Sequence, residues 1–189
     1  NRPVDEDMAA ELKGVFEQAE DGGLRTEALR MLAYGETHGE GLDLRSIGTL
    51  DDDPAVRAAA VELAAFEPGD DNRAWLEERL LQDDSLDVKA SALGALVYHA
   101  HYSGEGDAVL GYLERARKFS EDESVLGMIA EGERMVKSYD PRRVDLQLAE
   151  DAEFYGTLAR YTDGAAQRSF QRQARMLERM VGTLRGAKR

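Results

Sequence analysis

The two histidines at positions 99 and 101 are the side chains in this sequence that come closest to a metal or acid–base site. They lie in the stretch 98–102 (YHAHY), within a segment whose apolar residues have helical spacing. Two residues that are two positions apart lie on different sides of a helix, which argues against a shared metal ion or proton. His38 is the one further histidine in the chain. We therefore predict that His99 and His101 end a helix at the protein surface and bind no metal.

Other patterns that support catalysis or cofactor binding are absent from the sequence. The acidic triplet 51–53 lacks the alternating oxygen ligands, the glycine and the final glutamate of a calcium loop. Neither a glycine-rich phosphate loop nor a Gly-x-Ser-x-Gly elbow occurs. The chain has no cysteine, which excludes a thiol nucleophile, a disulfide and any cysteine-ligated metal. We predict no catalytic residue, no metal ligand and no cofactor.

The charge of the chain is strongly acidic and unevenly distributed. The 189 residues include 24 Lys and Arg against 38 Asp and Glu, a formal charge of −14. Residues 160–189 hold eight basic and two acidic residues, so they carry +6 and the remainder carries −20. Nucleic-acid binding requires a cationic surface that displaces counterions, so we predict no nucleic-acid partner.

The basic segment has the pattern of an amphipathic helix, with an apolar stripe and an arginine stripe on roughly opposite faces. We predict that its apolar face packs on a preceding helix at 141–161, and that its arginines bind an acidic protein surface. That acidic surface could belong to the chain's own body, to a second copy or to an unknown partner, and an anionic membrane surface is a further alternative. The apolar stripe comprises Phe170, Ala174, Leu177, Val181 and Leu184, widened by Met176 and Met180, and the arginines are Arg168, Arg172, Arg175 and Arg179.

A repeat of about 32 residues precedes this tail. The segment 51–63 (DDDPAVRAAAVEL) resembles segments 32 residues earlier and 32 residues later, and a looser copy starts at position 121. Each copy has an acidic turn before an apolar helix, as expected where Asp accepts hydrogen bonds from free N–H groups at a helix start. The aligned columns are Leu24, Val56 and Val88; Arg25, Arg57 and Lys89; and Ala28, Ala60 and Ala92.

Helical periodicity extends through the whole chain and favours an all-α fold. We expect four helix pairs followed by two longer helices that are separated by Asp163 and Gly164. The expected helices are 5–19 with 23–34, 42–50 with 54–66, 72–82 with 86–101, 106–118 with 122–138, and then 141–161 and 164–186.

An acidic turn, a proline, Val-Arg and an alanine-rich helix together resemble the HEAT repeat. The match is close at 53–57 (DPAVR), fair at 87–89 (DVK) and weak in the outer copies, and the resemblance covers roughly residues 5–138. The short period is similar to that of the HEAT-like repeats of bilin lyases. The resemblance implies a right-handed α-solenoid of about four HEAT-like helix pairs over residues 1–138. A C-terminal helical hairpin over 139–189 is then expected to cap and pack on the repeats as one unit.

Arg25, Arg57 and Lys89 recur at one column of the repeat, so stacking would align them as a ladder. A cationic stripe for an acidic partner is one interpretation. The second interpretation, which we favour, is that each cation binds a turn Asp or carbonyl of the neighbouring repeat and holds the stack together.

The absence of every tested catalytic pattern and the extended surface of stacked repeats together predict a non-catalytic protein–protein interaction module, such as a scaffold, adaptor or regulatory subunit. The resemblance also leaves open an enzyme or accessory of bilin-lyase type. Some HEAT-like oxygenases hold iron through His-Glu dipeptides, of which this sequence has none. We expect a cytoplasmic protein, because no signal peptide or long apolar run is present, although a leader removed before Asn1 stays open.

Overall fold

The computed structural model describes residues 6–33, 42–67, 69–102, 104–140 and 142–187, and these residues contain helices and no strand. The prediction of an all-helical chain is confirmed. A single turn of 3-10 helix, η1 (Ala64–Phe66), extends α4. The α-helices are α1 (Glu6–Gln18), α2 (Gly22–Ala33), α3 (Leu44–Leu50), α4 (Pro54–Leu63), α5 (Asp70–Gln82), α6 (Leu86–Tyr102), α7 (Gly106–Phe119), α8 (Glu123–Ser138), α9 (Val144–Tyr161) and α10 (Gly164–Ala187).

Aspartates in the acidic turns start three of the second helices, α2, α4 and α8. The side chain of Asp53 accepts a hydrogen bond from the backbone N–H of Ala55 at 2.8 Å, and Pro54 occupies the first turn of α4. Asp122 accepts from the N–H groups of Ser124 and Val125 at the start of α8. These carboxylates satisfy amide groups that have no partner within the helix, which explains why the acidic residues recur.

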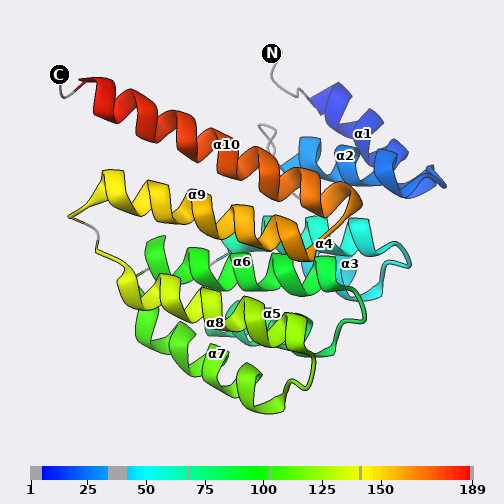
Figure 1. Ribbon diagram of the computed structural model, residues 1–189. Helices are drawn as coiled ribbons and strands as arrows, with labels where there is room; N and C mark the ends of the chain where they lie inside the picture. The colour runs from blue at the N-terminus through cyan, green and yellow to red at the C-terminus, as the bar shows by residue number, and fades with distance from the viewer. Residues whose placement is uncertain (1–5, 34–41, 68, 103, 141, 188–189) are drawn as a thin grey trace.

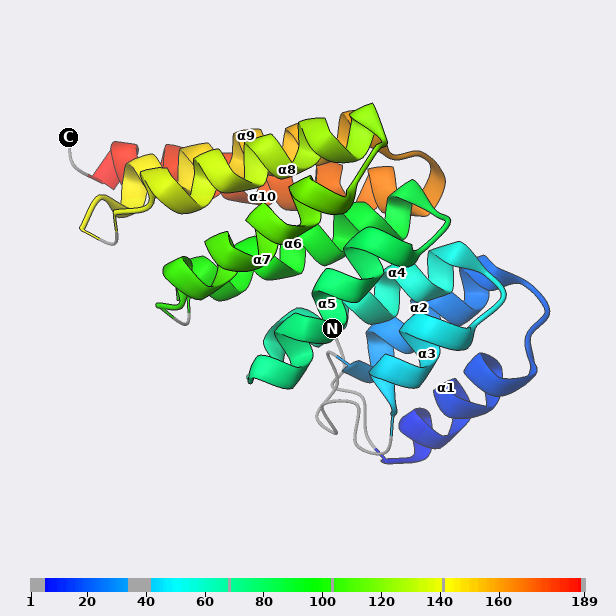
Figure 2. The same ribbon diagram turned by 90° about the horizontal axis from the view of Figure 1, so that it is seen from below.

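The helices pack in the order of the chain. Within each pair, α1 packs on α2, α3 on α4, α5 on α6 and α7 on α8, while the second helices α2, α4, α6 and α8 contact one another in turn. Figure 2 shows this succession from α1 at the lower right to α8 near the top. The hairpin of α9 and α10 then covers one side of the array, because α9 contacts α8 and α6, and α10 contacts α9, α4 and α6 (Figure 1).

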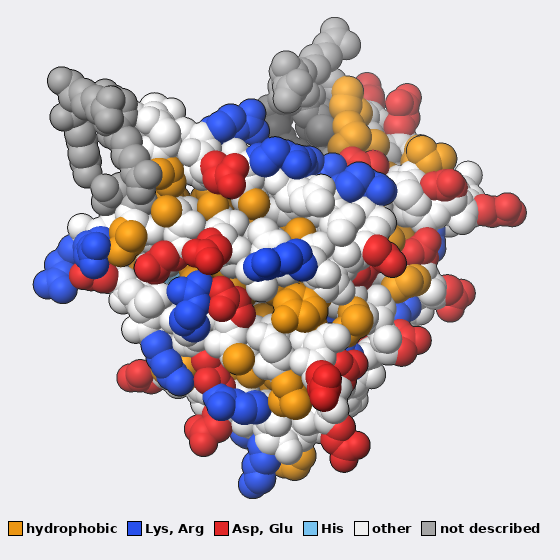
Figure 3. Space-filling model, in the orientation of Figure 1, with side chains coloured by type: hydrophobic (Ala, Val, Ile, Leu, Met, Phe, Trp, Pro, Cys, Tyr) orange, Lys and Arg blue, Asp and Glu red, His pale blue; other side chains and the backbone are white. Residues whose placement is uncertain are grey.

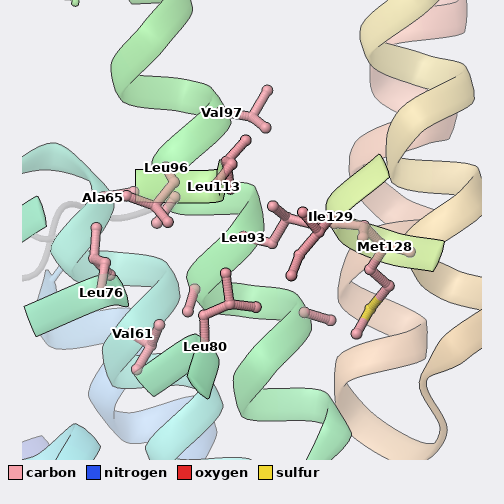
Figure 4. Packing of buried hydrophobic residues seen from close by; sticks show 14 of the residues in the cluster. Val61, Ala65, Leu76, Leu80, Leu93, Leu96, Val97, Leu113, Met128 and Ile129 are labelled. Atoms are coloured by element: carbon pink, nitrogen blue, oxygen red, sulfur yellow. The ribbon is translucent and has the colours of Figure 1, made fainter. Parts of the chain in front are cut away.

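Helix α6 lies at the centre of the main hydrophobic core. Its Leu93 lies beside Ile129 of α8, and its Leu96 lies on the side of Ala65 (Figure 4). Helix α8 approaches α6 closely at Gly132, where an added Cβ would lie 2.7 Å from Leu93 Cδ1. A side chain at this position would therefore force the Leu93 side chain to shift within the core. A second cluster joins α2 and α4 through Leu29, Val56, Ala59, Ala60 and Leu63.

A larger side chain at position 60 tests how tightly this second cluster is packed. Its side chain is completely buried, so Ala60→Leu should overpack the contact and lower the free energy of unfolding by about 1–3 kcal/mol. Ala74→Leu is the matched control, because Ala74 is exposed on α5. Urea unfolding measures both variants, and equal midpoints would show that the Ala60 column is loosely packed.

Candidate functional site

Two of the three predicted ladder residues hold adjacent helix pairs together. Arg25 donates two hydrogen bonds to the Asp51 carboxylate at 2.7 and 2.8 Å. Arg57 binds the Asp83 carboxylate in the same manner at 2.9 and 3.1 Å, and both contacts span 26 residues. Lys89 makes no ion pair within the described part of the chain. Since Arg25 and Arg57 are engaged inside the stack, this column offers no continuous cationic stripe.

Helix α10 separates its apolar stripe from its arginines as the sequence predicts, but Met176 and Met180 are 51% and 45% exposed and do not widen the buried face. The apolar side chains of Phe170, Ala174, Leu177 and Val181 are buried, and the last two pack on α9. The side chain of Leu184 lies outside the described residues. The predicted binding residues Arg168, Arg172, Arg175 and Arg179 are all exposed. Figure 3 shows a row of blue side chains that follows the line of α10 along the upper part of this face.

These four arginines, which we call the basic face of α10, make no ion pair with any described residue. By contrast, every described arginine of α2 to α8 is paired with a carboxylate. The paired arginines are Arg25, Arg30, Arg45, Arg57, Arg73, Arg79, Arg115, Arg117 and Arg134. The basic face therefore has no carboxylate partner among the described residues, although the chain as a whole has an excess of acid.

A groove of about 530 Å³ lies between the α9–α10 hairpin and the helices α4 and α6, with Arg30 of α2 at its edge. Its lining is mainly apolar, with six aromatic rings. We call it the α6–α10 groove. Exposed Phe66, Tyr102 and Met176 belong to its lining, and Arg172 of the basic face lines it as well. The six rings are Phe66, Tyr98, Tyr102, Phe154, Tyr155 and Phe170.

Glu62 joins three helices at one end of this groove. Its carboxylate accepts hydrogen bonds from Arg30 of α2 at 3.1 Å, from the Ser169 hydroxyl at 3.0 Å and from the Gln173 amide nitrogen at 2.7 Å. A carboxylate accepts and does not donate, so the amide nitrogen of Gln173 must face Glu62. Arg30 supplies the countercharge of Glu62, which leaves this end of the groove electrically balanced.

Asp151 and His101 form a buried pair at another part of the lining. The imidazole Nδ1 lies 3.2 Å from an Asp151 oxygen, and Nε2 lies 3.3 Å from the carbonyl oxygen of Met135. A carbonyl only accepts, so Nε2 carries a proton. The short contact at Nδ1 requires one more proton, on either His101 or Asp151. In both cases the pair has no net charge, and neither ring nitrogen is left for a substrate.

The prediction that the two histidines lie at the surface is wrong. His99 is 2% exposed and His101 is 4% exposed, because each packs against a different neighbouring element. His101 stacks on Tyr139 at 4.5 Å, while His99 lies 3.3 Å from the Asn72 amide of α5. Burial, followed by the charge of Arg73, lowers the pKa of His99, which favours its neutral form. The side chains of His99 and His101 point in different directions, as expected for two helix residues that are two positions apart. His38 lies outside the described residues.

No family model, no curated protein and no solved structure matches this chain. Within the ranges that the structure describes, no group of three acidic or histidine side chains could hold a metal ion. No described helix combines the length and the apolar character that crossing a bilayer requires.

The chemistry of the groove favours binding. Burial first, and then the charges of Asp151 and Glu62, raise the pKa of Tyr155, so this phenol stays protonated near neutral pH. The carboxylates of Glu62 and Asp151 in the lining are both committed to internal partners. The sequence did not reveal this groove, because Glu62, His101 and Asp151 lie far apart in the chain and show no recognisable spacing.

Proposed function

We propose that the protein is a non-catalytic interaction module of HEAT-like solenoid type, whose protein partner presents an acidic surface to the basic face of α10. The observation that carries the proposal is that the four arginines of this face are exposed and unpaired, whereas the arginines of α2 to α8 are paired.

The packing of α10 supports this role for its arginines. Phe170, Leu177 and Val181 attach the helix through its opposite side, so the basic face is not required for folding. Long arginine side chains carry a cost in conformational entropy that a bound acidic surface can offset through charge-assisted hydrogen bonds. Such contacts set orientation and association rate, and salt weakens them.

The architecture supports the solenoid part of the proposal. Second helices that contact one another in sequence order, and two ion pairs that both span 26 residues, are typical of a repeat array. Such arrays present extended surfaces to protein partners.

Charge reversal tests the proposed docking face. The triple variant Arg168→Glu, Arg175→Glu and Arg179→Glu should unfold at nearly the same urea concentration as the wild type, since all three side chains are exposed. It should also lose the proteins that the wild type retains from a cell lysate at low ionic strength. Sedimentation velocity under the same conditions detects a second copy as the partner.

A matched variant controls for net charge. Replacing exposed Lys13, Lys118 and Arg143 by Glu changes the formal charge by the same amount at other places. This control should keep the retained proteins. If the α10 variant keeps them too, or if the control loses them equally, the basic face is not the docking site.

A further inference from the structure

We propose that the α6–α10 groove binds a small amphipathic carboxylate, such as a medium-chain fatty acid, with its apolar chain in the groove and its carboxylate on Arg172. This would be a second binding activity beside the docking of a partner on α10, and the two share Arg172.

The size and lining of the groove suit a small apolar molecule. A volume of about 530 Å³ lies within the range of roughly 300–1,000 Å³ that ligand sites occupy. Aromatic rings such as Tyr98 and Phe154 and the flexible side chain of Met176 provide apolar contacts, and Met176 is half exposed. Methionine adapts to ligands of irregular shape, so this wall can adjust to an alkyl chain.

The charge balance of the lining selects an anion. Glu62 has its countercharge in Arg30, and the pair of Asp151 and His101 carries no net charge. Arg172 is then the one charged lining residue without a charged partner in the described structure. A ligand carboxylate can form a bidentate pair with its guanidinium. A cationic ligand would instead meet two carboxylates that already have partners.

The acidity of the whole chain does not oppose this site. Charges more than about 8 Å from the carboxylate are largely screened at physiological ionic strength. Arg168 and Arg175, four residues before and three residues after Arg172, are exposed and positive, and Glu178 is the single acidic residue of α10. The mouth of the groove beside α10 therefore attracts an anion locally.

Isothermal titration of the full chain with dodecanoate below its micelle concentration tests the proposal. One molecule should bind saturably to each chain, and octanoate should bind more than tenfold more weakly, because each buried methylene contributes about 0.8 kcal/mol. Arg172→Gln should weaken the binding of dodecanoate about tenfold and leave the binding of dodecanol, which has no carboxylate, unchanged. Arg168→Gln is the matched control on the same helix, and it should weaken dodecanoate binding clearly less than Arg172→Gln, because Arg168 does not line the groove and contributes only to the local charge.

Three results would overturn the proposal. Binding that never saturates would show that there is no built site. An equal loss in Arg172→Gln and Arg168→Gln would indicate general attraction to the basic face. Dodecanoate binding that is unaffected by Arg172→Gln would place the carboxylate elsewhere. None of these results depends on which proteins the chain retains from a cell lysate, so the proposed docking function is tested separately.

Discussion

Arg57→Met is expected to lower the free energy of unfolding by about 3 kcal/mol, because it removes the nearest cation of the buried Asp83 carboxylate and leaves only Arg79, 3.9 Å away. The side chain of Asp83 is 3% exposed, and Arg57 donates two hydrogen bonds to it. Arg57 also donates to the carbonyl oxygen of Asp51 at 2.9 Å, so one side chain connects two successive acidic turns. Methionine keeps an apolar stem of similar length and removes only the charge and its hydrogen bonds.

Arg142→Met is the matched control for urea unfolding. Arg142 pairs with Asp140, but its side chain is 88% exposed, and exposed pairs contribute about 0–1 kcal/mol. Similar losses in the two variants would show that the pair of Arg57 and Asp83 is not more important than a surface contact.

The pH dependence of the same variant gives a second measure of this pair. Burial alone would raise the pKa of Asp83, but hydrogen bonds from Arg57 and from the backbone of Ser85 outweigh it and lower the pKa. The pair therefore stabilises the fold above the pKa of an unfolded aspartate, about 3.9, and this stabilisation is lost as pH falls through the lower folded pKa. In acid, the Asp83 of Arg57→Met, which has lost its nearest cation, is protonated and no longer carries the cost of a buried, poorly paired charge. The stability difference from the wild type should then narrow, and a constant difference between neutral and acidic pH would contradict this account.

Phe170→Ala is expected to destabilise the protein by about 3–5 kcal/mol. Phe170 is 2% exposed and stacks on Tyr155 with ring centroids 6.2 Å apart, so it attaches α10 both to α9 and to the main core. The truncation should leave a cavity beneath the hairpin. Phe119→Ala is the matched control, because Phe119 is 68% exposed on α7, and its change should stay within about 0.5 kcal/mol. Equal urea midpoints would mean that α10 docks without this ring.

Helix positions could be predicted from the sequence because the signals that set them are local. Asp53 and Pro54 define the start of α4 within two residues of chain, and the stripe of Phe170, Leu177 and Val181 identifies the buried face of α10. The period of 32 residues also gave the correct columns for Arg25 and Arg57, and both of them pair with a turn of the next repeat.

The groove could not be predicted, since it depends on where the hairpin lies. Amphipathic periodicity shows that α10 has a buried face, but it does not show which helices cover that face. The contact of Ser169 and Gln173 with Glu62 selects α4, and no spacing in the sequence indicates it. The same limit explains the error over His101, whose partner Asp151 is 50 positions later.

The contacts of Glu62 also have a consequence for the order in which the chain assembles. Ser169 and Gln173 follow Glu62 by 107 and 111 residues, whereas Arg30 precedes it by 32. During synthesis, the pairing of Arg30 with Glu62 can form as soon as α4 emerges from the ribosome, while the other two hydrogen bonds wait for α10. Closing so long a loop costs entropy before its contacts compensate, so we expect the hairpin to dock late in folding. The array of paired helices then acts as the template on which the last two helices find their place.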